Sequence, residues 1–558
     1  MKWEQLARFI HTTQHLKLKQ IFFRLYYISK QISRSHLSSA GRGIRRVAAG
    51  GGFPHPLLCA TFSCWREKGC LSDTGTFLFH GETGRLDDVT IWNSTHHSKL
   101  WLYNIHYFDD LMCVNADARR DLLNRYIAIW LDNNPAYTGN GWEPYPLSLR
   151  LVNWVKWFST QKVEPQWLAS LAIQADALTQ QIEHHILGNH IFANGKALVF
   201  VGAYLSSQPA ERWLKKGLKI LDHEINEQFF ADGGHFERSP MYHAILLWDM
   251  CDLVHLAEQS HQPLLLSRKA QWQAVIERGL RWLSCMTHPD GDISFFNDAA
   301  FGIAPRLADL LLYAEQLGVY LLKESNELTS LSLLNASGYC AVNLKDNGKA
   351  ILDVANVGPD YQPGHAHADT LSFELSLYGQ RVIVNSGTSQ YGEGELRQFQ
   401  RSTTAHNTVC IDGANSSDVW AGFRVARRAY PRDLSVGSDF IGCAHDGYLR
   451  LPGRVTHHRK WVFSEKSMIA YDEMTGRWSD AEARFYLHPD IRVVDSQNDR
   501  VVCCLPEGQH IVFQFDGALT IRIEPSHWYP AFGLSVENRC LVVSIEENNL
   551  ATHINWSI

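Results

Sequence analysis

The sequence contains no long uninterrupted apolar run. The best candidate, residues 21–28, is broken by Arg24, whereas a membrane-spanning helix needs about 20 predominantly apolar residues. The first 30 residues alternate charged and apolar side chains and lack the apolar core and small-residue cleavage site of a secretory signal. We therefore expect no transmembrane span and a cytoplasmic location, with the periplasm as the alternative.

The cysteines also lack any spacing typical of disulfide or metal sites. The twelve cysteines are scattered, Cys503 and Cys504 are adjacent, and no CxxC pair occurs. This spacing fits neither a disulfide framework nor a zinc ribbon, so a reducing compartment is the default expectation.

The chain has little excess charge. Its 52 Lys and Arg residues face 58 Asp and Glu residues, a net charge of −6, which argues against a nucleic-acid partner. Residues 1–50 are the exception, with ten Lys or Arg and one acid, Glu4. Such a segment could touch an anionic membrane or polymer, or could be a solvated basic helix on the body of the protein.

What is present is an ordinary globular composition, 45% hydrophobic and 20% charged, in 558 residues. From about residue 116 to 316, apolar side chains recur at helical spacing, as in Leu122, Tyr126, Ile129 and Trp130. About eight helices are predicted, the later ones over 165–187, 190–204, 208–228, 240–258, 268–287 and 304–316. Their hairpin succession is typical of an α/α barrel or toroid.

After about residue 338 the apolar period changes to two, as in residues 381–384, 460–463 and 510–515. The fold class predicted is therefore α+β and multidomain. An incomplete α/α toroid is followed by a C-terminal antiparallel β-sandwich. The expected domains are a basic N-terminal region (1–94), the toroid (95–335) and the β-domain (336–558).

Two aromatic clusters stand among polar residues, at 101–107 and 142–145. Flat aromatic faces beside hydrogen-bonding groups suit sugar rings, but they also fill cores. Taken together, the clusters favour a saccharide groove that includes Tyr107, Trp142, Glu143 and Tyr145.

Three motifs could carry chemistry. In residues 188–196, Asn189 and His190 stand at a helix N-terminus, where an anion could dock or Asn189 could simply cap the helix. In residues 237–243, Pro240 opens a helix and places Tyr242 in its first turn, facing either core or cleft.

The third motif is the densest. His365 and His367 form an extended HxH, which puts both imidazoles on one side, where they can share a metal or divide roles. The polar residues that follow are Asp369, Asn385, Tyr391, Arg397, Arg401, His406 and Asn407. Their convergence on one sheet edge predicts a site.

Four ordered motifs, GNHIFANGKAL, FERSPMYH, GHAHAD…FEL and RSTTAHNTV, resemble the heparinase II/III-type polysaccharide lyases, which include heparin, heparan sulfate and alginate lyases. The resemblance runs from about Trp101 to the end of the β-domain. The fold it implies, a helical toroid before an antiparallel β-sandwich, agrees with the periodicity.

The activity that the resemblance implies is β-elimination on a uronate-containing anionic glycan. The enzyme must neutralise the uronate carboxylate, remove the C5 proton and protonate the departing O4. By resemblance, Asn189 with His190 would bind the carboxylate, and Tyr242 would be the acid, or both acid and base. His365 would be a base or charge neutraliser, and Tyr391 a candidate base. A tyrosine base needs cationic neighbours to lower its pKa from about 10, and we expect these from His190, His365, Arg397 and Arg401.

Further substrate contacts are expected from Tyr107, Trp142, Glu143, Tyr145, Arg150, Arg238, Arg397 and Arg401. The resemblance also implies a structural zinc held by His, Asp and His. The matching residues are His367, Asn385 and His406, and an amide in place of the carboxylate is a poorer zinc ligand. The sequence leaves open whether metal is absent or weak, or whether Asp369 substitutes.

Two other functions remain open. A uronyl C5-epimerase shares proton abstraction and carboxylate neutralisation but does not expel O4. A non-catalytic glycan-binding or assembly protein of a surface-polysaccharide system would fit the absent signal peptide. A hydrolase is less favoured, because Glu143, Asp232, Glu237 and Asp298 form no evident opposed pair in the sequence.

Overall fold

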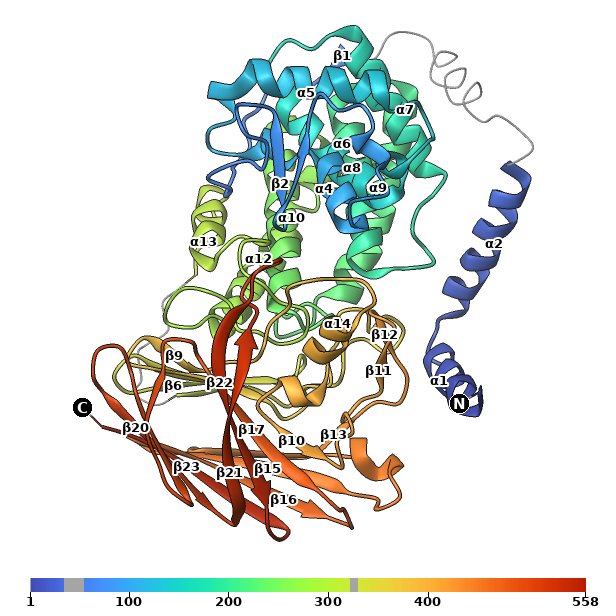
Figure 1. Cartoon of the computed structure of the whole chain (residues 1–558). Coiled ribbons are helices and arrows are strands. Elements are labelled where there is room, and N and C mark those ends of the chain that lie inside the picture. The colour runs from blue at the N-terminus through green and yellow to red at the C-terminus, as the bar shows by residue number, and fades with distance from the viewer. Residues whose placement is uncertain (1, 35–54, 322–329, 558) are drawn as a thin grey trace.

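The computed structural model describes residues 2–34, 55–321 and 330–557, and its helical part precedes its sheets, as predicted (Figure 1). The longer helices after the N-terminal pair are α4 (Lys99–Tyr107), α5 (Arg120–Asn133), α6 (Pro144–Phe158), α7 (Pro165–Thr179), α8 (Gly188–Tyr204), α9 (Gln208–Gln228), α10 (Pro240–Ser260), α12 (Lys269–Cys285) and α13 (Leu307–Gln316). Short α11 (Pro263–Leu266) joins α10 to α12.

Local sequence explains where these helices begin. Proline occupies the first turn of α6, α7, α9 and α10, where its missing N–H costs no hydrogen bond. Ser207 and Ser239 cap α9 and α10 by accepting a backbone N–H. The helix predicted over 165–187 is too long: α7 ends at Thr179, and residues 180–187 form a connection to α8.

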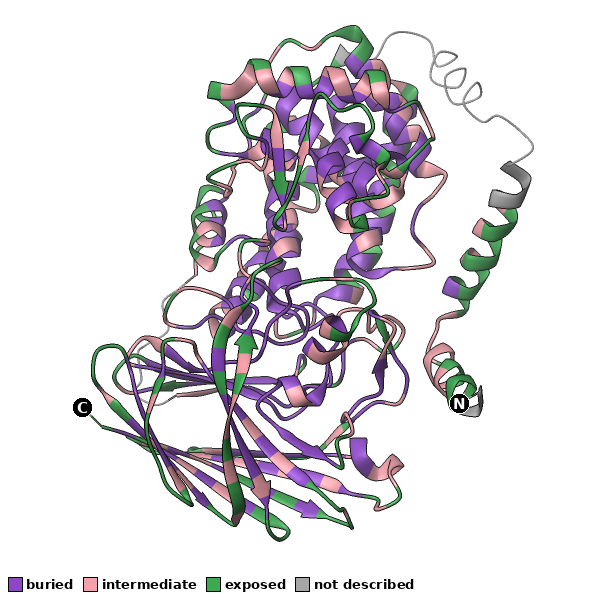
Figure 2. Ribbon diagram, in the orientation of Figure 1, coloured by how far each residue is buried: buried purple, intermediate pink, exposed green. Residues whose placement is uncertain are grey.

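Helix α8 lies at the centre of the helical part, and Figure 2 shows the inner helices as mostly buried. Every residue of α8 except His190 is buried. Because no face of this helix is free for solvent, His190 is the point where α8 opens to the outside.

The β-domain consists mainly of two antiparallel sheets. The first follows the order β21-β22-β17-β9-β8-β7-β6-β5, with β10 paired to β17. Its strands are β5 (Leu331–Leu334), β6 (Tyr339–Leu344), β7 (Gly348–Asp353), β8 (Phe373–Leu377), β9 (Gln380–Ile383), β10 (Val409–Ile411), β17 (Ala481–Leu487), β21 (Ala518–Trp528) and β22 (Val536–Ile545).

The second sheet follows the order β13-β14-β15-β16-β23-β20-β19-β18. Its strands are β13 (Pro431–Val436), β14 (Phe440–His445), β15 (Thr456–Phe463), β16 (Ser467–Thr475), β18 (Arg492–Ser496), β19 (Arg500–Cys504), β20 (His510–Asp516) and β23 (Asn549–Ser557). Residues of β15 alternate between buried and half-exposed, as expected when one face of a sheet covers a core. Both sheets contribute to one apolar cluster, so the domain is a sandwich.

Smaller elements complete the chain. These are α1 (Lys2–Thr13), α2 (Leu18–Arg34), β1 (His55–Pro56), β2 (Thr76–Phe79), β3 (Glu82–Arg85), β4 (Leu205–Ser206), β11 (Val419–Trp420), β12 (Arg424–Val425) and α14 (Glu395–Gln400). Phe77 and Phe79 of β2 belong to the same apolar cluster as the helices. The boundaries expected at residues 94 and 335 stay predictions. Within the described residues, no helix has both the length and the apolarity needed to cross a bilayer.

Candidate active site

The N-terminus of α8 brings the first motif to the interface between helices and sheets. The backbone enters α8 through Leu187 and Gly188, with φ of 72° and 60°. A side chain at position 188 would collide with Gln362 of the β-domain, so glycine permits both the turn and the close approach. Asn189 is buried, its backbone N–H donates to Glu237 Oε1 at 3.3 Å, and its Oδ1 has no hydrogen-bond partner.

His190 is held by a carboxylate. Its Nδ1 lies 2.9 Å from Glu183 Oε1, and its ring lies 4.4 Å from that of Tyr145. Burial lowers the pKa of His190, but the charge and hydrogen bond of Glu183 outweigh burial and raise this pKa above its ordinary value. The imidazolium form is therefore favoured at this position.

The N-terminus of α10 contributes the second motif. Ser239 Oγ caps the helix by accepting the N–H of Tyr242, and it also donates to the carbonyl of Asp298 at 2.5 Å. This fixes the first turn of α10, so that Tyr242 Oη lies 2.8 Å from Tyr391 Oη. Two tyrosines that are 149 residues apart in sequence thus share a hydrogen bond.

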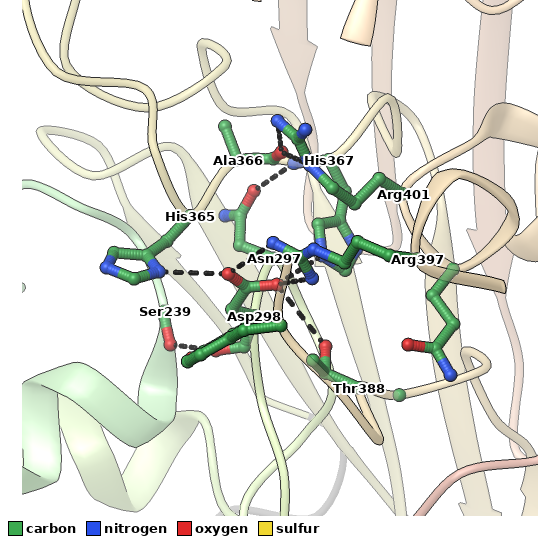
Figure 3. A network of polar contacts seen from close by, with 12 residues as sticks. Ser239, Asn297, Asp298, His365, Ala366, His367, Thr388, Arg397 and Arg401 are labelled. Carbon is green, nitrogen blue, oxygen red and sulfur yellow. Dashed lines mark hydrogen bonds and ion pairs between the residues drawn. The ribbon is translucent and has the colours of Figure 1, made fainter. Parts of the chain in front are cut away.

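Asp298 is the centre of the polar network drawn in Figure 3. Its carboxylate accepts from His365 Nδ1 at 2.9 Å, from His367 Nε2 at 2.8 Å and from both terminal nitrogens of Arg397. Burial alone would raise the pKa of Asp298, but the charge of Arg397 and these hydrogen bonds hold it well below its ordinary value. Asp298 is thus ionised, and both of its carboxylate oxygens are used to hold His365, His367 and Arg397 in place.

His365 is oriented by that anchor. Because Nδ1 faces the Asp298 carboxylate, Nε2 is the nitrogen left for other partners, and Glu237 Oε2 lies 3.8 Å from it. The ring lies against that of Tyr242, with centroids 3.9 Å apart and the planes tilted by 32°. Glu237 Oε2 is buried without a hydrogen bond, and burial raises the pKa of this carboxyl against the lowering charge of His365. This environment favours the protonated form of Glu237 more than water does.

Cationic neighbours do not lower the tyrosine pKa values overall, because burial outweighs the lowering effect of Arg397 on Tyr391. Burial raises the pKa values of both Tyr242 and Tyr391 well above 10. The positive charge of Arg397 is largely compensated by Asp298, and Arg401 bonds only to backbone carbonyls. The two tyrosines still differ, because the hydrogen bond from Tyr242 and the charge of Arg397 lower the pKa of Tyr391.

The predicted catalytic residues Asn189, His190, Tyr242, His365 and Tyr391 are brought together around Glu237 and Asp298, by the contacts given above. All four predicted substrate-binding arginines are instead buried, and Arg397 is held by Asp298. Arg150 bonds to Gln174 and two carbonyls, Arg238 to the carbonyls of Ser337 and Gly358, and Arg401 to that of Ala366. Their guanidinium groups connect segments of backbone in the interior.

The aromatic clusters divide between core and surface. Trp101 and Trp142 are buried, and Trp142 donates to the carbonyl of Asn134. Tyr145 is half-buried between the rings of His190 and Tyr107, which itself is buried. The partly exposed Glu143 forms an ion pair with Lys99 at 2.5 Å and accepts a hydrogen bond from the Tyr103 hydroxyl. Of these residues, Tyr145 is the one that touches the site cluster.

The metal ligands predicted from the sequence do not all meet. His367, Asp369 and His406 place one ligand atom each within 4.8 Å of one another and are all buried. Asn385 is used elsewhere, since its amide donates to the Phe295 carbonyl and accepts from Asn407. Asp369 therefore supplies the carboxylate that Asn385 lacks.

The hydrogen bonds around this triad indicate a place for a cation. His406 Nδ1 faces the Ser402 carbonyl and His367 Nε2 faces the Asp298 carboxylate, so both nitrogens carry hydrogen. The remaining nitrogens, His367 Nδ1 and His406 Nε2, lie 3.1 Å apart. If both rings are neutral, these two nitrogens point lone pairs at each other, which is unfavourable. A metal ion bound by both nitrogens, or an additional proton shared between them, would remove this repulsion. Two imidazoles and a carboxylate fit zinc.

A second buried histidine pair shows the contrast. His445 Nδ1 accepts from the N–H of Gly447, which leaves its Nε2 to donate to His457 Nδ1 at 3.3 Å. His457 Nε2 then donates to Asp472 at 2.7 Å. Each nitrogen has a complementary partner, so this pair requires no cation.

Asp298 and Asn297 are the residues whose importance the sequence did not reveal. Asn297 has φ of 57°, and its side chain donates to the Arg238 carbonyl and accepts from the His367 N–H. An Asn-Asp pair in a connection between helices was the available signal, because Asn tolerates this conformation better than most residues. From the sequence, Asp298 was a candidate only as one of the carboxyl groups that a hydrolase would need.

Comparisons with known proteins agree with this architecture. The family model for the heparinase II/III N-terminus matches residues 89–310, and that for the heparinase II/III-like C-terminal domain matches residues 326–557. A heparin-sulfate lyase from Bacteroides stercoris is 24% identical over 69% of this chain and 60% of its own length. The chain thus spans about three fifths of that relative. The FtsZ-localized protein C of Caulobacter vibrioides is 25% identical over 77% of this chain and 76% of its own.

Among solved structures, a heparinase III has a TM-score of 0.68 at 17% identity, covering 92% of this chain and 85% of its own. A heparan sulfate lyase from Pedobacter heparinus has a TM-score of 0.57 at 17% identity, covering 98% and 92%. At these identities the structural likeness shows the fold alone. The two family models together cover most of the sequence, and the chain belongs to the heparinase II/III-like family.

Proposed function

We propose that this protein is a polysaccharide lyase that cleaves a uronate-containing anionic glycan by β-elimination. The observation that carries the proposal is the hydrogen bond between Tyr242 and Tyr391, 2.8 Å long, beside a buried amide, two histidines and a buried carboxyl whose pKa is raised. Elimination needs a proton acceptor, a proton donor and a neutralised carboxylate, and these groups offer all three.

Carboxylate neutralisation falls to the N-terminus of α8. His190 supplies positive charge because Glu183 favours its imidazolium form. Asn189 offers an amide, and the raised pKa of Glu237 lets its unpartnered oxygen carry a proton toward an anion. A substrate carboxylate placed among them would lose the negative charge that opposes removal of the C5 proton.

Proton transfer falls to the tyrosine pair. Tyr391 is the better base, since the hydrogen bond from Tyr242 and the charge of Arg397 act against the effect of burial on its pKa. Tyr242 is the better acid for O4. Tyr391 acts in its phenolate form: it takes the C5 proton, the C4–O4 bond breaks, a C4–C5 double bond forms, and Tyr242 gives its proton to O4. A proton then passes from Tyr391 to the Tyr242 phenolate across their hydrogen bond, which restores the pair. His365 lies against the ring of Tyr242 and offers Nε2 as the alternative base.

The site is poorly suited to hydrolysis. An inverting or retaining glycosidase uses two opposed carboxyl groups, one as acid and one as base or nucleophile. Asp298 is saturated by Arg397, His365 and His367, which leaves Glu237 without an active partner.

The relative named FtsZ-localized protein C supports a second candidate, a non-catalytic glycan-binding or assembly protein. That name states a location and no reaction. This candidate predicts glycan binding without any chemical change, whereas a uronyl C5-epimerase predicts uptake of solvent deuterium without chain cleavage.

One experiment separates these functions. The protein is incubated with heparan sulfate, chondroitin and dermatan sulfates, hyaluronan, alginate and bacterial capsular polymers, and the ultraviolet absorbance of a 4,5-unsaturated uronate is followed. We expect a rise with at least one polymer, and none with Tyr242→Phe. A flat trace for the wild type across the panel would contradict the proposal, and deuterium uptake would then test epimerisation.

A further inference from the structure

The N-terminal helices α1 and α2 carry an unusual concentration of exposed apolar side chains. Across the described residues, 25 large hydrophobic side chains are exposed, and nine of them lie within residues 6–28. They are Leu6, Phe9, Ile10, Leu18, Ile21, Phe22, Leu25, Tyr26 and Ile28. A surface of this kind marks an interaction site.

On α2 these residues form one face. Leu18, Phe22 and Leu25 are 85%, 62% and 65% exposed and follow the spacing of a helical stripe. Ile21, Tyr26 and Ile28 widen the stripe on both sides. We name this set of six residues the α2 apolar face.

The opposite side of α2 holds the helix to the protein. Gln20 donates to the carbonyls of Ile186 and Tyr361, and Tyr27 donates to that of Ile182. The ring of Phe23 contacts that of His184, with centroids 4.5 Å apart. Because Gln20, Phe23 and Tyr27 face the body, the α2 apolar face points away from it. Figure 2 shows that much of α2 is exposed.

Cationic residues border the apolar face. Lys19 and Arg24 are exposed and lie on opposite sides of the stripe at 100° per residue. Residues 1–50 contain ten Lys or Arg and a single acid. An apolar stripe with basic edges is the arrangement that lies in the headgroup region of a bilayer.

We propose that α2 docks this protein on an anionic membrane surface, with the α2 apolar face inserted among the lipid headgroups. The helix has 17 residues and Arg24 near its middle, so it lies on the bilayer and does not cross it. Phe22 and Tyr26 provide the aromatic rings that favour this interface. Basic residues supply attraction to anionic lipid.

The docking places the candidate active site beside the membrane. Gln20 binds the carbonyl of Ile186, three residues before Asn189, and that of Tyr361, four residues before His365. The segments that carry two site residues therefore contact the docking helix directly. The docking itself does not depend on the proposed lyase activity, and its test measures binding alone.

The test is sedimentation of the full chain with vesicles of phosphatidylcholine, with or without about 30% phosphatidylglycerol. We expect binding to the anionic vesicles, weak binding to pure phosphatidylcholine, and a loss of binding in about 1 M salt. Phe22→Ser/Leu25→Ser should weaken binding by about tenfold or more, and Lys19→Glu should weaken it on anionic vesicles. These positions are exposed, so circular dichroism and melting should match the wild type.

The matched control is Val494→Ser/Leu519→Ser, which removes two exposed apolar side chains from the β-domain, 51% and 60% exposed. It should bind vesicles as the wild type does. No binding of the wild type to anionic vesicles would overturn the proposal, as would binding unaffected by Phe22→Ser/Leu25→Ser. A wild-type dimer that this variant converts to a monomer, without lipid binding, would assign the face to a second copy.

Discussion

Lys196 of α8 and Asp252 of α10 form a buried ion pair, with Nζ and Oδ2 2.5 Å apart. Lys196 also binds Asp249 on α10, and Lys156 of α6 binds the same oxygen of Asp252 at 2.6 Å. These contacts lie about two turns along α8 from Asn189 and two to three turns along α10 from Tyr242. The network therefore fixes the relative position of two helices whose N-termini carry the candidate site.

Removing Lys196 should be costly because it leaves the buried Asp252 and the partly buried Asp249 with a single cation. We expect Lys196→Met to lower the free energy of unfolding by about 3–5 kcal/mol, measured by urea denaturation. Arg306→Gln, which breaks a surface pair with Asp292, should cost less than about 1 kcal/mol. Equal effects of the two substitutions would show that the network does not stabilise the fold.

Removing either hydroxyl of the tyrosine pair should lower turnover sharply while leaving binding nearly intact. For Tyr242→Phe and Tyr391→Phe we expect kcat to fall by about 10² to 10⁴, the usual contribution of a positioned acid or base. Glycan affinity, measured by calorimetry, should change little. Tyr204→Phe is the control, because the Tyr204 hydroxyl is buried without a partner. Activity retained in Tyr391→Phe alone would transfer the role of base to His365.

The contact between Glu183 and His190 should shape the pH dependence of activity. The raised pKa keeps His190 charged at low pH, and that charge is lost as the pH rises through the raised value. Glu183→Gln removes the charge that raises the pKa, so the alkaline limb of kcat/KM should move to lower pH. Tyr145→Phe is the control: it alters a neighbour of His190 but keeps Glu183, so the alkaline limb of kcat/KM should not move. If the alkaline limb of kcat/KM does not move in Glu183→Gln, then the charge of His190 does not contribute to the rate.

The triad of His367, Asp369 and His406 should bind one zinc ion per chain, measured by elemental analysis of protein purified without chelator. Chelation should lower the Tm, because metal binding stabilises the folded state. His406→Gln should remove the metal, whereas His457→Gln alters the second histidine pair and should retain it. Metal-free wild-type protein would mean that a proton joins His367 and His406.

Much of the fold follows from the sequence, because periodicity reports local structure and burial of one face. Residues 208–228 were predicted as a helix and form α9 with those bounds, and the strand predicted at residues 510–515 is β20. The prediction that the helix continues from Thr179 to residue 187 is wrong. Residues 180–187 contain apolar and amide side chains that are common in helices, but they form no helix here. They form the connection on which α2 rests.

The sequence by itself determined the order of a helical part and a sandwich, and the motifs that hold Asn189, Tyr242 and His365. Tertiary structure alone decided which polar groups meet. Asp298 became the anchor of the network, Asp369 entered the triad in place of Asn385, and predicted substrate arginines such as Arg150 turned inward to carbonyls. The reason is physical: spacing along a chain sets which face a residue occupies. Its hydrogen-bond partner is set by segments that only folding brings within 3 Å.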